Sequence, residues 1–411
     1  MAKTWSDLAR SEQAEAPALP RVPVLMILLL LSAFAQARLW PTVPPDFDLY
    51  LIPWYQHLVE HGPIDSFAVP FSNYSPPYLY LLSLASLTEP WLTPFDAIKL
   101  LSLAISLWLA VATLGLLRAA EVSEPARGAA LVLGLPTLLL NSALLGQCDA
   151  LWVAPLLLAL AACLNERPRK MLVWVGIAFS IKAQAAFLAP LVFAYLLGRK
   201  SPWQWWLIPP AAYMAMLLPA WAVGWPATDL LLIYLRQGQA LSSFISNAPS
   251  VWSIAAFFAP SATLPLIPAG FVIATAGCLA MTWRMRSWLV NGRSLVLAAL
   301  LSALVVPFVL PKMHERYLLL ADVFAFAVAI IFRTRSTLAL AALVQGASLA
   351  ALSSYIFGPD IWAVAATIAA AASIAWTFSL LRAERASPLL HHPQESRGPA
   401  AAAFLVGQPA N

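Results

Sequence analysis

The strongest constraint on this chain is a series of long apolar runs that few charges interrupt. Hydrophobic residues make up 61% of the 411 residues and charged residues only 10%, whereas about 25% of the residues of a soluble domain are charged. The runs are continuous rather than alternating, which is typical of membrane-spanning helices and not of an outer-membrane barrel. We therefore expect an all-α polytopic membrane protein with about twelve spans, near residues 24–40, 98–117, 128–145, 149–164, 171–181, 184–198, 204–223, 266–283, 294–310, 317–332, 337–357 and 361–381.

The basic residues predict how these spans are oriented, because short cytoplasmic loops carry an excess of Lys and Arg. If the N-terminus is cytoplasmic and residues 77–88 form a short element that does not cross, every basic cluster falls on the cytoplasmic side. If residues 77–88 crossed, the next four clusters would face outward. The bias therefore favours twelve spans with both termini inside. The clusters are Arg118/Arg127, Arg167/Arg169/Lys170, Arg199/Lys200, Arg284/Arg286/Arg293, Arg333/Arg335 and Arg382/Arg385.

The two ends of the chain are predicted to lie outside the membrane. Residues 1–23 read as a cytoplasmic N-terminal segment, residues 24–382 as one transmembrane domain, and residues 383–411 as a disordered cytoplasmic tail rich in Pro, Ala and polar side chains. The first apolar run ends in Ala35-Gln36-Ala37, which resembles a signal-peptidase site, so a cleaved signal peptide stays an alternative.

This orientation gathers the polar chemistry on the extracytoplasmic face of the cell (inner) membrane. Most carboxylates, and every histidine before the tail, fall in outer segments, whereas the cytoplasmic loops are short and basic. The net charge of +5 is small, so nucleic acid is not an expected partner. The outer segments are residues 41–97, 146–149, 182, 224–265 and 311–316.

Two carboxylates, Asp46 and Asp48, open the first long outer loop. They could serve as helix N-caps, but a carboxylate at the mouth of a membrane cavity is also what a general base requires. Residues 49–61 follow as an amphipathic stretch that is expected to lie in the membrane interface, with Tyr50 off its apolar stripe. The sequence His57-Leu58-Val59-Glu60-His61 matches a zinc-peptidase pattern, which we interpret as accidental because no third ligand is evident downstream.

Three further outer segments carry polar residues between apolar ones. Tyr74 precedes a Pro pair in a rigid turn that either shapes the loop or provides a wall for a sugar ring. Gln147 and Asp149 either cap the following helix or contact a ligand. Lys182 lies within apolar sequence, where a lysine costs about 2.5–3.5 kcal/mol at the bilayer centre. It must therefore reach a partner or the interface, either by snorkelling or by meeting an anionic ligand at outer-leaflet depth.

The densest charged cluster before the tail joins two spans at residues 311–317. Lys312, His314, Glu315 and Arg316 are predicted to lie outside, where the positive-inside bias gives no reason for them. Cationic side chains in such a place bind phosphate oxygens with charge-assisted hydrogen bonds. Tyr317 follows directly and completes the motif.

In their order and spacing, these motifs resemble those of the GT-C superfamily of membrane glycosyltransferases, which use polyprenyl-phosphate-linked sugars. The resemblance covers roughly residues 24–325 and is closest to the bacterial and archaeal mannosyltransferase-like branch. Cys148 stands where Phe is common in related proteins, and residues 180–183 stand where Lys-Pro is common. The motifs are Asp46-Phe47-Asp48, Tyr74-Ser75-Pro76-Pro77, Gly146-Gln147-Cys148-Asp149, Phe179-Ser180-Ile181-Lys182-Ala183-Gln184 and His314-Glu315-Arg316-Tyr317.

The resemblance implies a GT-C-like bundle whose long first outer loop carries interfacial helices, and an inverting transfer of mannose or a similar hexose. The partners would be a polyprenyl-phosphate-linked sugar donor, a glycan or glycolipid acceptor, and the lipid bilayer. It leaves room for a divalent cation, Mg²⁺ or Mn²⁺, at the two catalytic carboxylates, Asp46 and Asp48. Implied donor-phosphate ligands are Lys182, Lys312, His314 and Arg316, and implied sugar or acceptor contacts are Tyr50, Tyr74, Gln147, Asp149, Glu315 and Tyr317.

Two rival functions stay open at the level of sequence. A transporter or flippase of a lipid-linked sugar should show repeated halves and broken helices with polar groups near the midplane, and the sequence shows no repeat. A polymerase or ligase of lipid-linked glycans would keep the membrane and the lipid carrier but would transfer an oligosaccharide.

Overall fold

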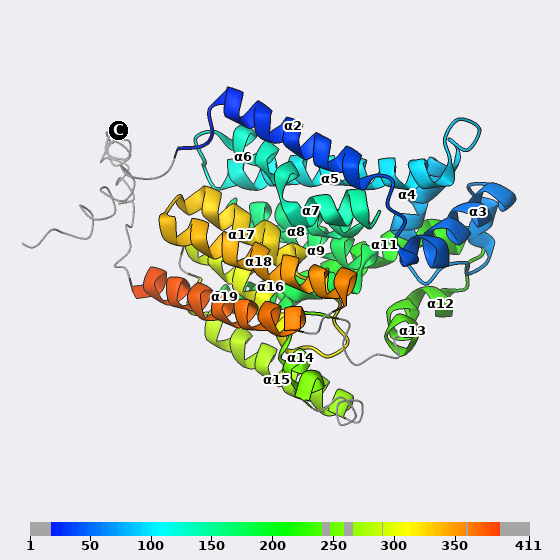
Figure 1. The fold of residues 1–411 in the computed structure, drawn as a ribbon. Coiled ribbons are helices and arrows are strands. Elements are labelled where there is room, and N and C mark those ends of the chain that lie inside the picture. Colours follow the sequence, from blue (N-terminus) through cyan, green and yellow to red (C-terminus); the bar gives the residue numbers. More distant parts are fainter. Residues whose placement is uncertain (1–17, 241–246, 259–265, 290, 359–360, 387–411) are drawn as a thin grey trace, which may run out of the picture.

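The computed structural model describes residues 18–240, 247–258, 266–289, 291–358 and 361–386, and every regular element in these ranges is a helix (Figure 1). One isolated bridge joins Asn247 to His314. In chain order the elements are α2 (Val22–Leu39), η1 (Phe47–Leu51), α3 (Ile52–His61), η2 (Asp65–Ala68), α4 (Pro76–Ser86), α5 (Pro94–Ala119), α6 (Pro125–Leu131), η3 (Val132–Gly134), α7 (Pro136–Leu139), η4 (Leu140–Leu144), α8 (Asp149–Leu164), α9 (Pro168–Ile181), η5 (Ala183–Leu188), α10 (Ala189–Gly198), η6 (Trp203–Leu207), α11 (Ile208–Val223), α12 (Ala227–Leu231), α13 (Ile233–Ala240), α14 (Val251–Phe258), α15 (Ile267–Met285), α16 (Gly292–Val309), α17 (Leu319–Phe332), α18 (Arg335–Phe357) and α19 (Ile361–Ala386).

Proline and hydroxyl or amide caps define where the helices begin. Pro94 and Pro168 occupy the first turns of α5 and α9, where a missing N–H costs nothing. Asn291 and Thr334 form capping boxes at the starts of α16 and α18. The helical boundaries that apolar periodicity leaves vague are therefore fixed by local chemistry.

Seven of the described helices are long and apolar enough to cross a membrane, which supports a polytopic membrane protein. An eighth span results if α6–η3 and α7–η4, which meet at an angle of 56°, are counted as one broken span. The twelve spans expected from sequence include runs that form only shorter helices, such as α8, α17 and the joined η5–α10. The segment expected not to cross, residues 77–88, forms α4, an eleven-residue helix.

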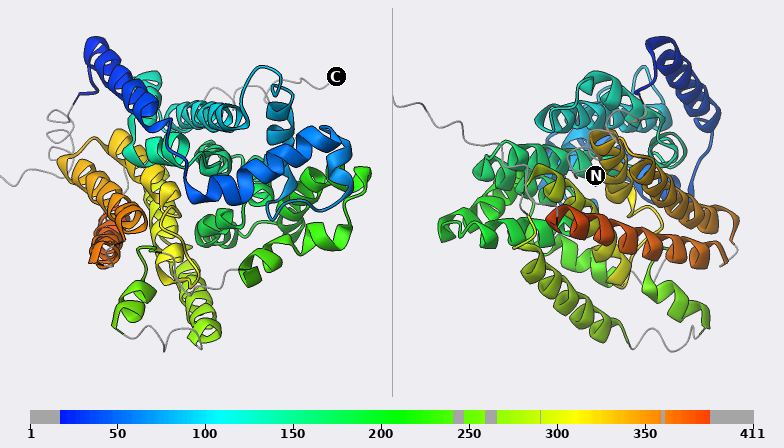
Figure 2. Two further views of the ribbon diagram at one scale, coloured as in Figure 1. Left: turned by 45° about the vertical axis from the view of Figure 1, so that its right-hand side comes forward. Right: turned by 90° about the vertical axis from the view of Figure 1, so that its left-hand side faces the viewer.

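The helices surround a buried centre formed mainly by α8, α16 and α17 (Figures 1 and 2). On one side α5, α8, α9 and α11 pack in succession, and on the other α16 contacts both α17 and α19 while α18 packs on α19. The windows of α2, Trp203–Val223 and α15 that could span a membrane are only 11–17% buried inside the protein. Their apolar outer faces are suited to contact with lipid.

Contacts between loops and helix ends bring residues of several basic clusters together at one end of the bundle. Arg199 pairs with Glu166, and Arg333 contacts Ser123. Arg293 pairs with Glu384 and lies over the ring of Phe332. The start of α2 and the end of α19 lie at this end in Figure 1, opposite α3, α12 and α13.

The segments predicted to be extracytoplasmic meet at the opposite end. Asp46 contacts Arg316, Gln237 donates to the carbonyl of Asn73, and Lys312 donates to the carbonyl of Gly238. The boundaries of the membrane domain differ slightly from expectation, because α2 begins at Val22 and α19 continues to Ala386. Residues 1–17 and 387–411, which include most of the predicted tail, lie outside the described residues.

Candidate functional site

Four segments that are distant in sequence meet in one charged cluster. Asp46 precedes η1, the Gln147–Asp149 turn links η4 to α8, Lys182 separates α9 from η5, and the Glu315–Arg316 pair lies between α16 and α17. These residues contact one another directly through hydrogen bonds and ion pairs. The cluster has a buried half around Asp149 and an open half around Asp46.

Asp149 is the centre of the buried half, with a side chain that is 1% exposed. It accepts hydrogen bonds from Lys182 Nζ at 2.6 Å, Asn141 Nδ2 at 2.8 Å and Trp152 Nε1 at 3.2 Å. Because a buried carboxylate is costly unless paired and hydrogen-bonded, this set of donors explains how the charge is tolerated. It leaves Asp149 little capacity to bind a substrate.

The same ion pair accounts for Lys182, whose position in apolar sequence had suggested snorkelling or an anionic ligand. Helix α9 ends at Ile181, and Lys182 has an extended backbone with φ −149° and ψ 141°. Burial alone would lower the pKa of the Lys182 ammonium, but the Asp149 carboxylate raises that pKa well above its usual value. Lys182 is thus paired with an internal carboxylate, and its role toward a donor phosphate stays a prediction.

Asp46 is the centre of the open half, and 28% of its side chain is exposed. Its Oδ2 lies 3.2 Å from Gln147 Nε2 and 3.4 Å from Arg316 Nη1. Gln147 in turn accepts a hydrogen bond from the Tyr74 hydroxyl at 3.3 Å. Asp46 therefore has two oriented partners and still reaches the surface of the site.

Arg316 links the two halves. Its Nη1 lies 3.1 Å from Glu315 Oε1, and its Nε lies 3.8 Å from Asp149 Oδ2. Burial opposes ionisation of Glu315, but hydrogen bonding by His314 and the charge of Arg316 outweigh it and lower the Glu315 pKa. The cluster thus contains the carboxylates of Asp46, Asp149 and Glu315 against two cations, Lys182 and Arg316.

Aromatic rings form a wall beside this cluster. The Tyr74 ring lies under Lys182, with Nζ 4.8 Å from its centroid, and packs on Trp54 at 4.9 Å. Burial raises the Tyr74 pKa to about 12, so the hydroxyl keeps its proton for the bond to Gln147. Tyr317 packs against Phe187 and His314. Aromatic faces next to a few convergent polar groups are typical of small-molecule sites.

Other predicted site residues lie at the margin of the cluster. Asp48 is exposed on η1, and Tyr50 is 42% exposed and contacts Trp54. Lys312, with a left-handed φ of 62°, donates to the carbonyl of Gly238 at 2.6 Å. His314 keeps 18% of its side chain exposed and approaches Glu315 Oε2 at 3.8 Å. Within the 312–316 segment, Arg316 contacts Asp46 and Asp149 of the other segments, and Glu315 pairs with Arg316.

Sequence reasoning missed Lys99, which fixes the segment that carries Asp46. Lys99 is 1% exposed, and its Nζ donates to the carbonyls of Trp40, Thr42 and Ala143 at 2.6–2.7 Å. It also lies 4.6 Å from the centroid of the Phe95 ring. A lysine at the edge of an apolar run was a visible signal, but its partners are backbone carbonyls that no motif identifies.

Gly146 belongs to a motif noted in the sequence, but the reason for a glycine there was missed. It has a φ of +60°, and a Cβ there would lie 2.3 Å from Cε2 of Phe47. Both the left-handed backbone and the close approach of the ring require glycine. Gly146 thus allows the 147–149 turn to meet the segment that begins at Asp46.

A smaller polar cluster continues from the site between α17 and α18. Ser348 donates to Asp322 Oδ1 at 2.9 Å, and Asp322 is 1% exposed. A cavity of about 10 Å³ beside these residues is also lined by Asn141 and Arg316, which is room for about one water molecule.

The residues present do not fit the divalent cation that the resemblance allows at Asp46 and Asp48. The positive charge that a metal ion would supply at Asp46 is already provided by Arg316, and Asp48 is exposed. Among the described residues, no group of three His, Cys, Asp or Glu side chains is arranged to hold a metal ion. We therefore derive no chemical step through a metal.

Comparison with known proteins gives no family: neither protein-family models nor curated proteins match the chain. Its function is therefore argued from the geometry of the site.

Proposed function

We propose that this protein is an integral membrane hexosyltransferase of GT-C type, with a bundle of about twelve membrane passages. It would transfer a monosaccharide, mannose or a similar hexose, from a polyprenyl-phosphate carrier to a glycan or glycolipid acceptor with inversion. One observation carries the proposal. The motifs that produce the resemblance span 270 residues, from Asp46 to Arg316, and their side chains meet in one cluster with a partly exposed carboxylate.

In this mechanism Asp46 is the general base. A hydroxyl of the acceptor loses its proton to an Asp46 carboxylate oxygen while the hydroxyl oxygen attacks the anomeric carbon. The bond from that carbon to the phosphate oxygen breaks, and the electron pair leaves with the polyprenyl phosphate. A positioned base contributes about 10²–10⁴-fold to such a step.

The leaving phosphate needs cations where its charge develops. Lys182 already forms an ion pair with Asp149. We therefore assign the binding of the leaving phosphate first to Arg316 and to the partly exposed His314, with Lys312 nearby in sequence. Gln147 and Tyr74 would hold the acceptor or the sugar beside Asp46. Asp48, exposed on the same turn, would contact the acceptor rather than act as the base.

The site is proposed to face the extracytoplasmic side of the cell membrane. Single cysteines at Asp65 and Glu166, each on a Cys-free background, test this with an impermeant thiol reagent applied to intact cells. Labelling at position 65 alone is expected. Labelling at position 166 alone would reverse the orientation.

The decisive assay supplies purified protein with a panel of polyprenyl-phosphate monosaccharides and candidate acceptors, and reads the product lipids by mass spectrometry. Release of polyprenyl phosphate with gain of one hexose on the acceptor is expected for one donor. Turnover should fall at least about 10²-fold in Asp46→Asn. Transfer of an oligosaccharide would favour the ligase alternative instead.

The transporter alternative gains one observation from the fold. The bent pair α6–η3 and α7–η4 has the form of a broken span or a re-entrant loop, and Thr137 on α7 lies beside the buried Asp322. Broken spans with buried polar groups are typical of transporters. Movement of an intact lipid-linked sugar across proteoliposomes, without hexose transfer, would select this function.

A further inference from the structure

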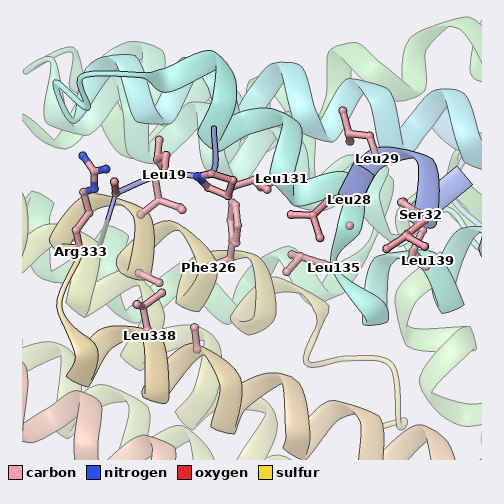
Figure 3. Close-up of a pocket in the computed structure, with 17 residues that line it drawn as sticks. Leu19, Leu28, Leu29, Ser32, Leu131, Leu135, Leu139, Phe326, Arg333 and Leu338 are labelled. Atoms are coloured by element: carbon pink, nitrogen blue, oxygen red, sulfur yellow. The ribbon is translucent and has the colours of Figure 1, made fainter. Parts of the chain in front are cut away.

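An apolar groove lies beside α2, with Arg333 at one end and Leu139 toward the other (Figure 3). Its cavity volume is about 520 Å³, within the range of small-molecule sites. Helix α2 forms one wall, the bent segment α6–α7 the floor, and α17 and α18 the other wall. Residues lining it include Leu28, Leu131, Leu135, Leu139, Phe326 and Leu338.

The groove results from how α2 packs. This helix rests on α6, η3, α7 and η4, and the hydroxyl of Ser32 is bound to the carbonyl of Leu133 at 2.8 Å. At one end Leu19 packs with Leu117 and Ile330. In the floor, a Cβ added at Gly134 would meet no atom within 4 Å. The contacts of α2 with the floor and the missing side chain at Gly134 therefore leave the groove open between α2 and the α17–α18 pair.

One cation, Arg333, lines the groove at the end of the bundle where the basic loops gather. It follows the last residue of α17 with a left-handed φ of 53°. Its Nη1 reaches Ser123 Oγ at 3.5 Å, whereas its Nε is buried and has no hydrogen-bond partner among the described groups. A buried N–H group normally donates to a hydrogen-bond acceptor. The donors of a guanidinium fit the geometry of phosphate oxygens.

We propose that this groove binds an anionic membrane phospholipid, with an acyl chain along the apolar walls and the phosphate at Arg333. The walls offer a water-soluble ligand almost no polar partner, since Ser32 is already satisfied. The groove borders α2, whose apolar face is exposed where the bilayer would lie. Basic pockets between membrane helices are characteristic sites for anionic lipid head groups.

The site is separate from the proposed donor site. Arg316 precedes α17 and Arg333 follows it, and the fourteen residues of this helix span about 21 Å at 1.5 Å per residue. A phosphate at Arg333 therefore cannot be the phosphate at Arg316.

The two sites nevertheless share a wall. Leu135 and Leu139 line the groove, while Asn141, two residues further along, holds Asp149. A lipid in the groove would support the bent segment from its outer side. We expect lipid binding to raise the thermal stability of the protein whether or not it is a glycosyltransferase.

The experiment measures binding of phosphatidylglycerol and phosphatidylcholine to detergent-purified full-length protein by native mass spectrometry, with thermal unfolding in parallel. Wild type should prefer phosphatidylglycerol by about fivefold, the gain expected for one basic residue near an anionic head group. Arg333→Gln should abolish this preference. Gly134→Phe, which fills the groove, should reduce binding of both lipids and the stabilisation they give.

Gly277→Phe is the matched control, because Gly277 is an exposed helical glycine of α15 with no atom within 4 Å of an added Cβ. It should bind both lipids like wild type. Undiminished binding in Gly134→Phe, or an unchanged preference in Arg333→Gln, would overturn the proposal. So would displacement of the phospholipid by an equimolar polyprenyl phosphate. If Gly134→Phe does not fold, the Arg333→Gln and competition results decide alone.

Discussion

Asp149 and Asp46 lie on either side of Arg316, yet their surroundings differ sharply. Asp149 is 1% exposed and receives three hydrogen bonds from side chains, whereas Asp46 is 28% exposed and receives one from Gln147. A carboxylate whose acceptor sites are filled by its own protein can hold a fold together. A carboxylate with free capacity at the surface of a site can act on a ligand.

This difference assigns separate tasks to two motifs that look alike in sequence. Both are short acidic segments at the start of a helix, and both are compatible with simple N-caps. Only the number and kind of partners tells them apart. We therefore expect changes in the buried half to affect folding first and changes in the open half to affect turnover first.

The largest effect should come from Lys182→Met. It leaves the Asp149 charge buried without its main partner, and breaking a buried pair in this way typically costs about 3–5 kcal/mol. Unfolding of the solubilised protein, followed by temperature or denaturant, measures this loss. The double variant Asp149→Asn with Lys182→Met should be clearly more stable than Lys182→Met alone; equal stability would contradict the role of the pair.

The next effect is expected from Gly146→Ala. The added Cβ meets the Phe47 ring at 2.3 Å in a left-handed backbone, so we expect a loss of about 2–4 kcal/mol in the free energy of unfolding. Gly62→Ala provides the control, since Gly62 also has a positive φ but no atom within 4 Å. If both variants lose the same stability, the contact with Phe47 does not matter.

Asp46→Asn should leave folding nearly unchanged and lower turnover by at least about 10²-fold, because the amide keeps the shape but cannot take a proton. Single-turnover transfer with the identified donor measures this, alongside donor affinity. Asp48→Asn is the paired variant, for which we expect a loss of about tenfold or less. Near-normal turnover in Asp46→Asn would contradict the assignment of Asp46 as the general base.

The smallest effect is expected from Asp322→Asn, a buried carboxyl whose hydrogen-bond donor is the Ser348 hydroxyl. Asparagine can accept the same bond, and no cation is paired with Asp322 among the described residues. The free energy of unfolding should change by less than about 1 kcal/mol. Asp149→Asn, which leaves Lys182 without a carboxylate, should cost distinctly more. Equal losses would mean that burial, and not pairing, determines the cost.

Sequence reasoning could anticipate the helical class and the meeting of the outer segments, because apolar runs and basic loops have a direct physical meaning. It placed Asp46, Gln147, Asp149, Lys182 and Arg316 in one region. It could not anticipate that Lys182 is neutralised by Asp149, since that pairing depends on how α8 packs on α9.

The structural reasons for Lys99 and Gly146 could not be predicted from the sequence either. Lys99 binds three carbonyls, and Gly146 is defined by a φ angle and by one ring. Lys99 belongs to no motif, and the motif that contains Gly146 does not reveal its contact with Phe47. The break at Lys182, in contrast, was predicted, because the apolar runs 171–181 and 184–198 stop on either side of it, where α9 ends and η5 begins.

The distance along the chain between two paired charges also determines how long after the first residue its partner is synthesised. Asp149 and Lys182 are 33 residues apart, so a ribosome working at about 5–20 residues per second makes both within roughly 2–7 s. Arg316 follows Asp46 by 316 − 46 = 270 residues, a delay of roughly 14–54 s at the same rate. The buried half can therefore assemble early and serve as a platform. In the first outer loop, Asp46 cannot form its ion pair with Arg316 until the ribosome has synthesised Arg316.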